Sequence, residues 1–167
     1  MGEEESLRDF FYEIADDAYA VILGCVGTDR NFVIPSYAER YEVREIGMNA
    51  FRNADIENVA MPETLTVLQQ CAFFGCEALN GIVLPENLRS IGYGAFYECI
   101  NLESAQIHEG VETIGTYAFY NTGITRIDLP DSLKDSCSSL DELIIPEGIN
   151  SMNTGAFEGC DKLIQKL

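Results

Sequence analysis

Apolar residues recur along this chain with a period of about 23 residues, far longer than the period of one helix or strand. An Ala-Phe pair marks each repeat, and its phenylalanines are Phe51, Phe73, Phe96, Phe119 and Phe157. A second mark occurs at Pro35, Pro62, Pro85, His108, Pro130 and Pro146. A fixed period in the twenties is typical of a solenoid, in which each repeat forms one coil that only its neighbours can bury.

Each coil is predicted to contain two short strands and one tight turn. The segments GIVLP (81–85) and RIDLP (126–130) alternate as strands, and the inward positions are Ile82, Leu84, Ile127 and Leu129. Proline ends such a strand because it cannot donate to a ladder. The apolar pair Leu88 and Ile91 indicates a second strand on the opposite wall. Glycine follows where the chain turns tightly or packs closely, and Ala-Phe then suits a single helical or 3₁₀ turn.

The pattern L-x-x-I-x-L-P-x-x-L-x-x-I-G-x-x-A-F-x-x-C resembles the BspA-type leucine-rich repeat family of bacterial proteins over about residues 32–165. The resemblance implies an α/β solenoid, coiled in a right-handed sense, with a parallel sheet on one wall. It also implies a cell-surface or secreted protein of a host-associated microbe that serves adhesion or protein contact. It carries over no catalytic residue.

The whole chain, 1–167, is predicted to be one domain, with an N-terminal cap at 1–31 and repeats at 32–167. The segment DFFYEIADDAYAVILGC alternates as two strands around Asp16-Asp17, which predicts a β-hairpin cap. One coil, at about 130–146, is shortened: Leu133 precedes Cys137 by 4 residues, where the same interval elsewhere is 11. The shortening is either a tolerated deletion or a notch shaped for a partner.

The C-terminal segment, about 162–167, reads as a strand with no cap after it. An open parallel edge favours pairing with another chain. We therefore expect either edge-mediated self-association or a longer natural protein that continues with further coils. The alternative is a monomer whose last residues fold back over the edge.

The net negative charge of the chain limits the kinds of partner that it can bind. The chain has 28 acidic and 10 basic residues and a net charge of −18, which argues against nucleic acid or an anionic membrane as a partner, since both require a basic face. No segment reaches the roughly 18 apolar residues of a membrane span. The acidic start shows no signal peptide, which leaves open a cytoplasmic protein or one whose leader has been removed.

The residues capable of catalysis or metal binding do not form a known catalytic or metal-binding motif. Of the six cysteines, four share one inward repeat position, namely Cys76, Cys99, Cys137 and Cys160, and are expected to be free and buried. There is no CxxC to suggest zinc. His108 replaces the strand-ending proline and has no base or nucleophile associated with it. We therefore expect neither enzymatic activity nor a cofactor.

Two surface series remain as candidate contact sites. Outward positions of the first strand of each coil predict a protein-contact face made by Asn58, Val83, Ser104, Gln106, Arg126, Asp128, Glu142 and Ile144. The residues that follow Ala-Phe predict an aromatic ladder of Phe74, Tyr97 and Tyr120. Such a ladder either shields the turns below it or stacks against a sugar.

These features predict a non-enzymatic binding module that acts in protein–protein recognition or adhesion at a bacterial cell surface. The alternative is a carbohydrate-binding module, with a host or cell-surface glycan on the aromatic ladder.

Overall fold

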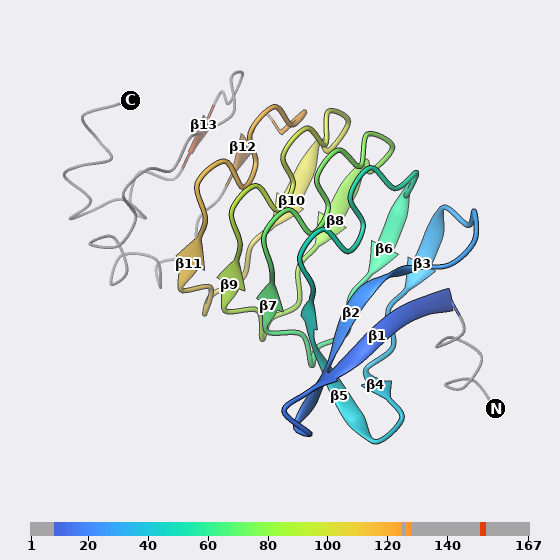
Figure 1. The fold of residues 1–167 in the computed structure, drawn as a ribbon. Coiled ribbons are helices and arrows are strands. Elements are labelled where there is room, and N and C mark those ends of the chain that lie inside the picture. Colours follow the sequence, from blue (N-terminus) through green and yellow to red (C-terminus); the bar gives the residue numbers. More distant parts are fainter. Residues whose placement is uncertain (1–8, 125, 128–150, 153–167) are drawn as a thin grey trace.

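Two walls of short strands make up the solenoid in the computed structural model, which describes residues 9–124, 126–127 and 151–152 (Figure 1). The strands that precede the repeated proline position form one wall, called here the proline wall: β3 (Asn31–Val33), β6 (Asn58–Ala60), β8 (Gly81–Val83), β10 (Ser104–Gln106) and β12 (Arg126–Ile127). The opposite wall contains β5 (Tyr41–Ile46), β7 (Val67–Leu68), β9 (Ser90–Ile91) and β11 (Thr113–Ile114).

Strands of neighbouring coils are parallel and in register. On the proline wall, β3 pairs with β6 and β8 with β10, and on the opposite wall β5, β7, β9 and β11 follow one another in a single sheet. Because the register follows the repeat, residues at equivalent positions lie beside one another from coil to coil. The predicted parallel solenoid is confirmed for the described residues.

The N-terminal cap is the predicted β-hairpin. Strands β1 (Phe10–Ala15) and β2 (Tyr19–Cys25) pair antiparallel, and Asp16 and Asp17 in the turn both have positive φ, 51° and 53°, as a type I′ hairpin turn requires. β2 then pairs in parallel with β5, and the short strand β4 (Tyr37–Ala38) pairs antiparallel with β5. The hairpin thus continues the opposite wall beyond the first repeat.

The phenylalanines of the Ala-Phe pairs form one buried column through the core. Phe51, Phe73, Phe96 and Phe119 are at most 2% exposed. Their ring centroids are 5.0, 5.4 and 5.3 Å apart, and adjacent rings are nearly parallel. Phe10 of the cap meets Phe51 edge-on at 6.4 Å and closes the column at the N-terminal end. Phe157, predicted to belong to the same column, lies outside the described residues.

The predicted helical or 3₁₀ turns are wrong, because none of the elements in the described part of the chain is a helix. The N–H groups of Ala95 and Tyr97 donate to carbonyls three residues earlier, at 3.2 and 3.1 Å, but the intervening Phe96 N–H donates to Ala118 of the next coil at 2.7 Å. Alternate amides therefore bind between coils, which prevents the continuous local series that a helix needs. The described part is a β-solenoid rather than an α/β one.

Two of the repeated glycines allow the coils to approach closely. A Cβ at Gly115 would lie 2.4 Å from the amide nitrogen of Tyr93, and one at Gly92 would lie 2.6 Å from the carbonyl carbon of Gln69. Neither glycine has the positive φ of a left-handed turn. Of the two roles predicted for these glycines, close packing is therefore the one that the structure shows.

The shortened coil at about 130–146 and the C-terminal strand lie outside the described residues. Nearby, β12 pairs in parallel with β13 (Ser151–Met152), with Arg126 opposite Ser151. Ile149 precedes Cys160 by 11 residues, as Leu88 precedes Cys99, so the repeat predicts that this segment belongs to the opposite wall. The pairing of β13 with β12 differs from that prediction. The seven residues missing from the shortened coil interrupt the repeat between these two strands.

Replacement of Phe96 by alanine should destabilise the protein by about 3–5 kcal/mol, because it opens a cavity in the middle of the column. The measurement is urea unfolding followed by circular dichroism. Ile100→Ala is the matched control, since Ile100 belongs to the same coil but is 45% exposed and should change stability by less than about 0.5 kcal/mol. Equal effects of the two substitutions would contradict a continuous buried column.

Candidate functional site

The outward residues of the proline wall gather on one surface. In β6, β8 and β10 the central residues Val59 and Ile82 are buried and Ala105 is half-buried, whereas the flanking Asn58, Val83, Ser104 and Gln106 are exposed. This alternation follows from the period of two in a strand. The four exposed residues are those predicted from the sequence, and together with Ala60 and Gly81 they line a groove of about 790 Å³. This surface is called here the proline-wall groove.

The remaining residues of the predicted contact face are less well defined. Arg126 lies in β12, next along the same wall from β10. Asp128, Glu142 and Ile144 lie outside the described residues. The described part of the candidate site therefore spans β6, β8 and β10.

Equivalent positions form two rows across the strands. The first row contains Asn31, Asn58, Gly81 and Ser104, and Asn58 Nδ2 donates to Asn31 Oδ1 at 2.7 Å. The second row contains Val33, Ala60, Val83 and Gln106. Val33 and Val83 are 68% and 65% exposed, and Ala60, which lies between them in the row, is exposed as well. One row is thus polar and the other is largely apolar.

Asn31 and Val33 are not among the contact residues predicted from the sequence. Both belong to β3, which pairs with β6 and extends the two rows by one coil. The signal was present in the segment NFVIP, which alternates like the other first strands and ends at the first repeated proline. The predicted boundary between the cap and the repeats, at residue 31, falls at the start of this segment.

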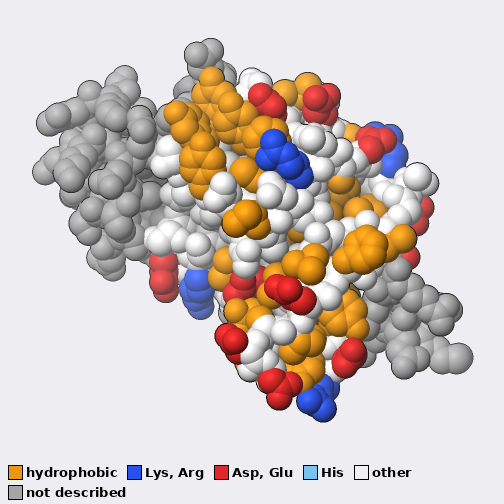
Figure 2. Space-filling model, viewed as in Figure 1, with side chains coloured by type: hydrophobic (Ala, Val, Ile, Leu, Met, Phe, Trp, Pro, Cys, Tyr) orange, Lys and Arg blue, Asp and Glu red, His pale blue; other side chains and the backbone are white. Residues whose placement is uncertain are grey.

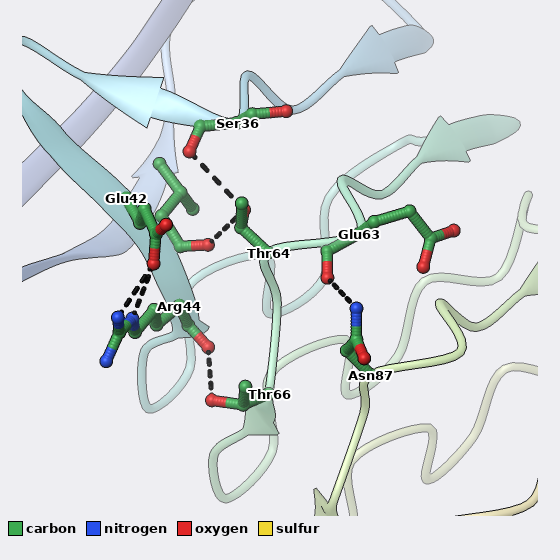
Figure 3. Close-up of polar contacts among 8 residues, drawn as sticks. Ser36, Glu42, Arg44, Glu63, Thr64, Thr66 and Asn87 are labelled. Carbon is green, nitrogen blue, oxygen red and sulfur yellow. Dashed lines mark hydrogen bonds and ion pairs between the residues drawn. The ribbon is translucent and has the colours of Figure 1, made fainter.

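Two carboxylates of the proline-wall groove are also absent from the contact residues predicted from the sequence. Glu63 and Glu103 line the proline-wall groove, and no Lys, Arg or His is among its lining residues. Glu63 Oε2 accepts a hydrogen bond from the Glu86 N–H at 3.1 Å. Arg44 does not pair with Glu63 but donates twice to Glu42 Oε2, at 2.9 and 2.8 Å, and Figure 3 shows the Glu63 carboxylate directed away from Arg44.

Polar side chains also tie one coil to the next beside the groove. Thr64 Oγ1 donates to the Val43 carbonyl at 2.7 Å, Thr66 Oγ1 to the Arg44 carbonyl at 3.2 Å, and Asn87 Nδ2 to the Glu63 carbonyl at 2.9 Å (Figure 3). Each bond joins neighbouring coils. The backbone beside Glu63 is therefore held in place.

The predicted aromatic ladder exists and is stacked. The rings of Phe74 and Tyr97 are 4.9 Å apart and those of Tyr97 and Tyr120 are 5.0 Å apart, with interplanar angles of 7° and 25°. The Arg52 guanidinium lies 3.8 Å from the centroid of the Phe74 ring and ends the stack. Figure 2 shows hydrophobic side chains gathered over the turns of the solenoid, with a basic side chain beside them.

Tyr117 meets both Tyr97 and Tyr120 edge-on, at 6.1 and 5.5 Å. Tyr97 therefore has an aromatic ring against each of its faces and a third at its edge. Stacking against a sugar requires an open ring face, which Tyr97 does not offer. This geometry favours the role of a cover for the turns.

The described cysteines are free thiols, at positions 25, 71, 76 and 99. Cys76 and Cys99 are fully buried, and their Sγ atoms each lie 3.0 Å from a phenylalanine carbonyl of the preceding coil, that of Phe51 and of Phe73 respectively. The hydrogen bond with Cys76 and then burial raise the pKa of the Cys99 thiol well above its usual range. Both thiols act as core residues, as the sequence predicts, while Cys137 and Cys160 lie outside the described residues.

Within the described residues, no group of three or more His, Cys, Asp or Glu side chains could hold a metal ion. His108 is half-buried in the loop that follows β10. No helix of the length and apolar character needed for a bilayer span occurs in the part of the chain that the structure describes.

Comparison with known proteins identifies the repeat. Six copies of the BspA type leucine rich repeat region match residues 44–164. The match extends through the region of the shortened coil. Comparison with curated proteins gave no significant match.

Several solved structures have a similar fold. A leucine-rich repeat protein of T. pallidum is 26% identical with a TM-score of 0.73, and the alignment covers 94% of this chain and 67% of that protein. A leucine-rich repeat protein of Bacteroides ovatus is 22% identical with a TM-score of 0.69, covering 93% of this chain and 44% of the other. The pneumococcal vaccine antigen PcpA is 15% identical with a TM-score of 0.59, covering 88% and 48%. The chain spans about half the length of the last two.

Cys76 and Cys99 should resist alkylation in the native protein at pH 8, because burial excludes the reagent and the raised pKa of Cys99 keeps its thiol protonated. Peptide mapping by mass spectrometry after brief iodoacetamide treatment measures the modified fraction at each position. After unfolding without a reductant, both residues should be labelled completely. Label missing from the unfolded protein would mean that these cysteines are in disulfides.

Proposed function

Because the chain belongs to the BspA-type leucine-rich repeat family, we propose that it is a non-enzymatic binding module that recognises a protein through the proline-wall groove. The observation that carries this proposal is the pair of exposed valines, Val33 and Val83, on a wall whose inward residues are buried. Exposed apolar side chains within a rim of polar ones are typical of a protein contact surface.

The architecture supports recognition of a macromolecule rather than of a small one. The groove crosses strands from successive coils, and in its middle Gly81 has no side chain and Ala60 only a methyl group, which leaves room for a partner's backbone. Asn58, Ser104 and Gln106 supply hydrogen-bonding groups around it. A repeat scaffold holds such groups at a constant spacing, and solenoids use extended surfaces of this kind for binding.

Adhesion at a bacterial cell surface is part of the same proposal, because the family resemblance implies that location. The proposed binding surface also includes Arg126, which lies in β12, and the sequence-predicted Asp128, Glu142 and Ile144, which lie outside the described residues. The partner in this proposal is a protein that presents a surface of matching length.

Glycan binding on the aromatic ladder is the competing hypothesis. The stacking of Phe74, Tyr97 and Tyr120 on one another supports a covering role instead. The two hypotheses place the contact on different faces of the coil, so substitutions can separate them.

Selection of peptides from a phage-displayed library against the wild-type protein tests the proposal. The double variant Val33→Asn and Val83→Asn removes the apolar row without changing the charge, and should weaken binding of the selected peptides at least about tenfold. Ile100→Asn is the matched control, because Ile100 is also exposed but belongs to no strand of the proline wall. Fluorescence anisotropy with a labelled peptide measures the affinity.

A glycan array supplies the opposing test. Specific binding of a sugar that is lost in Tyr97→Ala and Tyr120→Ala but retained in the double valine variant would overturn the proposal. Selected peptides that bind the double valine variant as well as they bind the wild type would also overturn it.

A further inference from the structure

The proline-wall groove has carboxylates at two opposite corners. Glu63 follows β6, beyond the proline that ends that strand, and Glu103 immediately precedes β10. The two residues therefore lie at opposite ends of strands two coils apart. With about 3.3 Å per strand residue and about 4.8 Å between strands, their backbones are separated by roughly 20 Å.

Nearby arginines do not neutralise these carboxylates. Arg44 pairs with Glu42 at 2.8 Å. Arg30 pairs with Asp55 at 2.9 Å and also contacts Glu57. The hydrogen bond from the Glu86 N–H orients Glu63 but brings no charge to it. Arg89 lines a neighbouring hollow together with Arg44 and Glu63, but it donates to the Gly110 carbonyl at 3.2 Å. Among the described residues, the groove thus has a carboxylate at each of these corners and no Lys, Arg or His in its lining.

The space between the two carboxylates suits an extended chain. Gly81 at the centre allows a partner's backbone to come close, the exposed side chain of Val83 offers an apolar contact, and Asn58 and Ser104 offer hydrogen bonds. Alternate side chains of an extended segment face the same way. Seven residues in this conformation span about 20 Å, so the side chains of the first and seventh residues would reach the two corners.

We infer that the proline-wall groove binds a basic, extended protein segment, with a Lys or Arg near each carboxylate and small apolar side chains between them. This inference rests on the proposed function of the groove and adds the charge and conformation of the partner. The chain's net charge of −18 would speed the approach of such a segment through long-range attraction. The local arrangement of Glu63 and Glu103 would determine where it binds.

Three capped, fluorescently labelled heptapeptides serve as probes: Lys-Ser-Val-Ser-Val-Ser-Lys, and the same peptide with Gln or with Glu at both ends. Anisotropy titrations of the protein at low and at physiological salt give the affinity of each. The Lys peptide should bind at least about threefold more tightly than the Gln peptide at low salt, and the difference should shrink as salt is added. The Glu peptide should bind most weakly.

Paired variants separate the groove from the overall charge. Glu63→Gln with Glu103→Gln removes both corner charges, and the amide oxygen at position 63 can still accept the Glu86 N–H. Glu13→Gln with Glu112→Gln is the matched control, because it changes the net charge equally at exposed residues of β1 and of the loop before β11. The first pair of substitutions should lower the affinity for the Lys peptide about three- to tenfold, and the second pair should leave this affinity unchanged. Thermal unfolding establishes that both variants are folded.

Three results would overturn the inference. Equal affinity for the Lys and Gln peptides would mean that the groove does not select charge. An equal loss of affinity in the two double variants would mean that the Lys peptide is attracted by the overall negative charge of the protein and not by the groove. Failure of the Lys peptide to bind would exclude this segment class as the ligand. None of these results bears on the valine variants and display-selected peptides, which decide the proposed function separately.

Discussion

Stacking of each coil on the next is the interaction on which the rest of this structure depends. The four described phenylalanines of the column lie about 5 Å apart in near-parallel pairs, and offset aromatic pairs contribute about 0.5–1.5 kcal/mol beyond their buried area. Alternate amides of the turns donate to carbonyls of the next coil. A single coil has neither of these interactions with itself, so the coils must form together.

This dependence explains the small residues of the repeat. Ala72, Ala95 and Ala118 are fully buried beside the phenylalanines, and side chains at Gly92 and Gly115 would collide with the backbone of the preceding coil. Larger side chains at these positions would separate the coils and lengthen the hydrogen bonds between them. The same close spacing brings Asn58, Gly81 and Ser104 into one row on the proline wall. The candidate binding surface is thus a consequence of the packing inside.

The two faces of the coil use aromatic and charged residues differently. On the turn side, Arg52, Phe74, Tyr97 and Tyr120 stack on one another, so that both faces of the Tyr97 ring are covered. On the proline wall, the valines point outward and the carboxylates at the corners of the groove have no cationic partner among the described residues. This difference is the reason for proposing protein recognition on the wall over glycan binding on the ladder.

The sequence by itself determined the repeat, the two strands of each coil, the buried phenylalanines and thiols, and the hairpin cap, because each is encoded by the identity and spacing of residues within one coil. It also predicted four described residues of the groove, Asn58, Val83, Ser104 and Gln106, through the alternation of short strands. Only the tertiary structure decided that the Ala-Phe segments are turns and not helices. Their N–H groups can donate either to a local carbonyl or to one in the next coil, and the second partner is present only after the coils have stacked. The tertiary structure likewise decided that Val33 extends the apolar row and that Glu63 and Glu103 share one groove, because these residues meet only when separate coils stack in register.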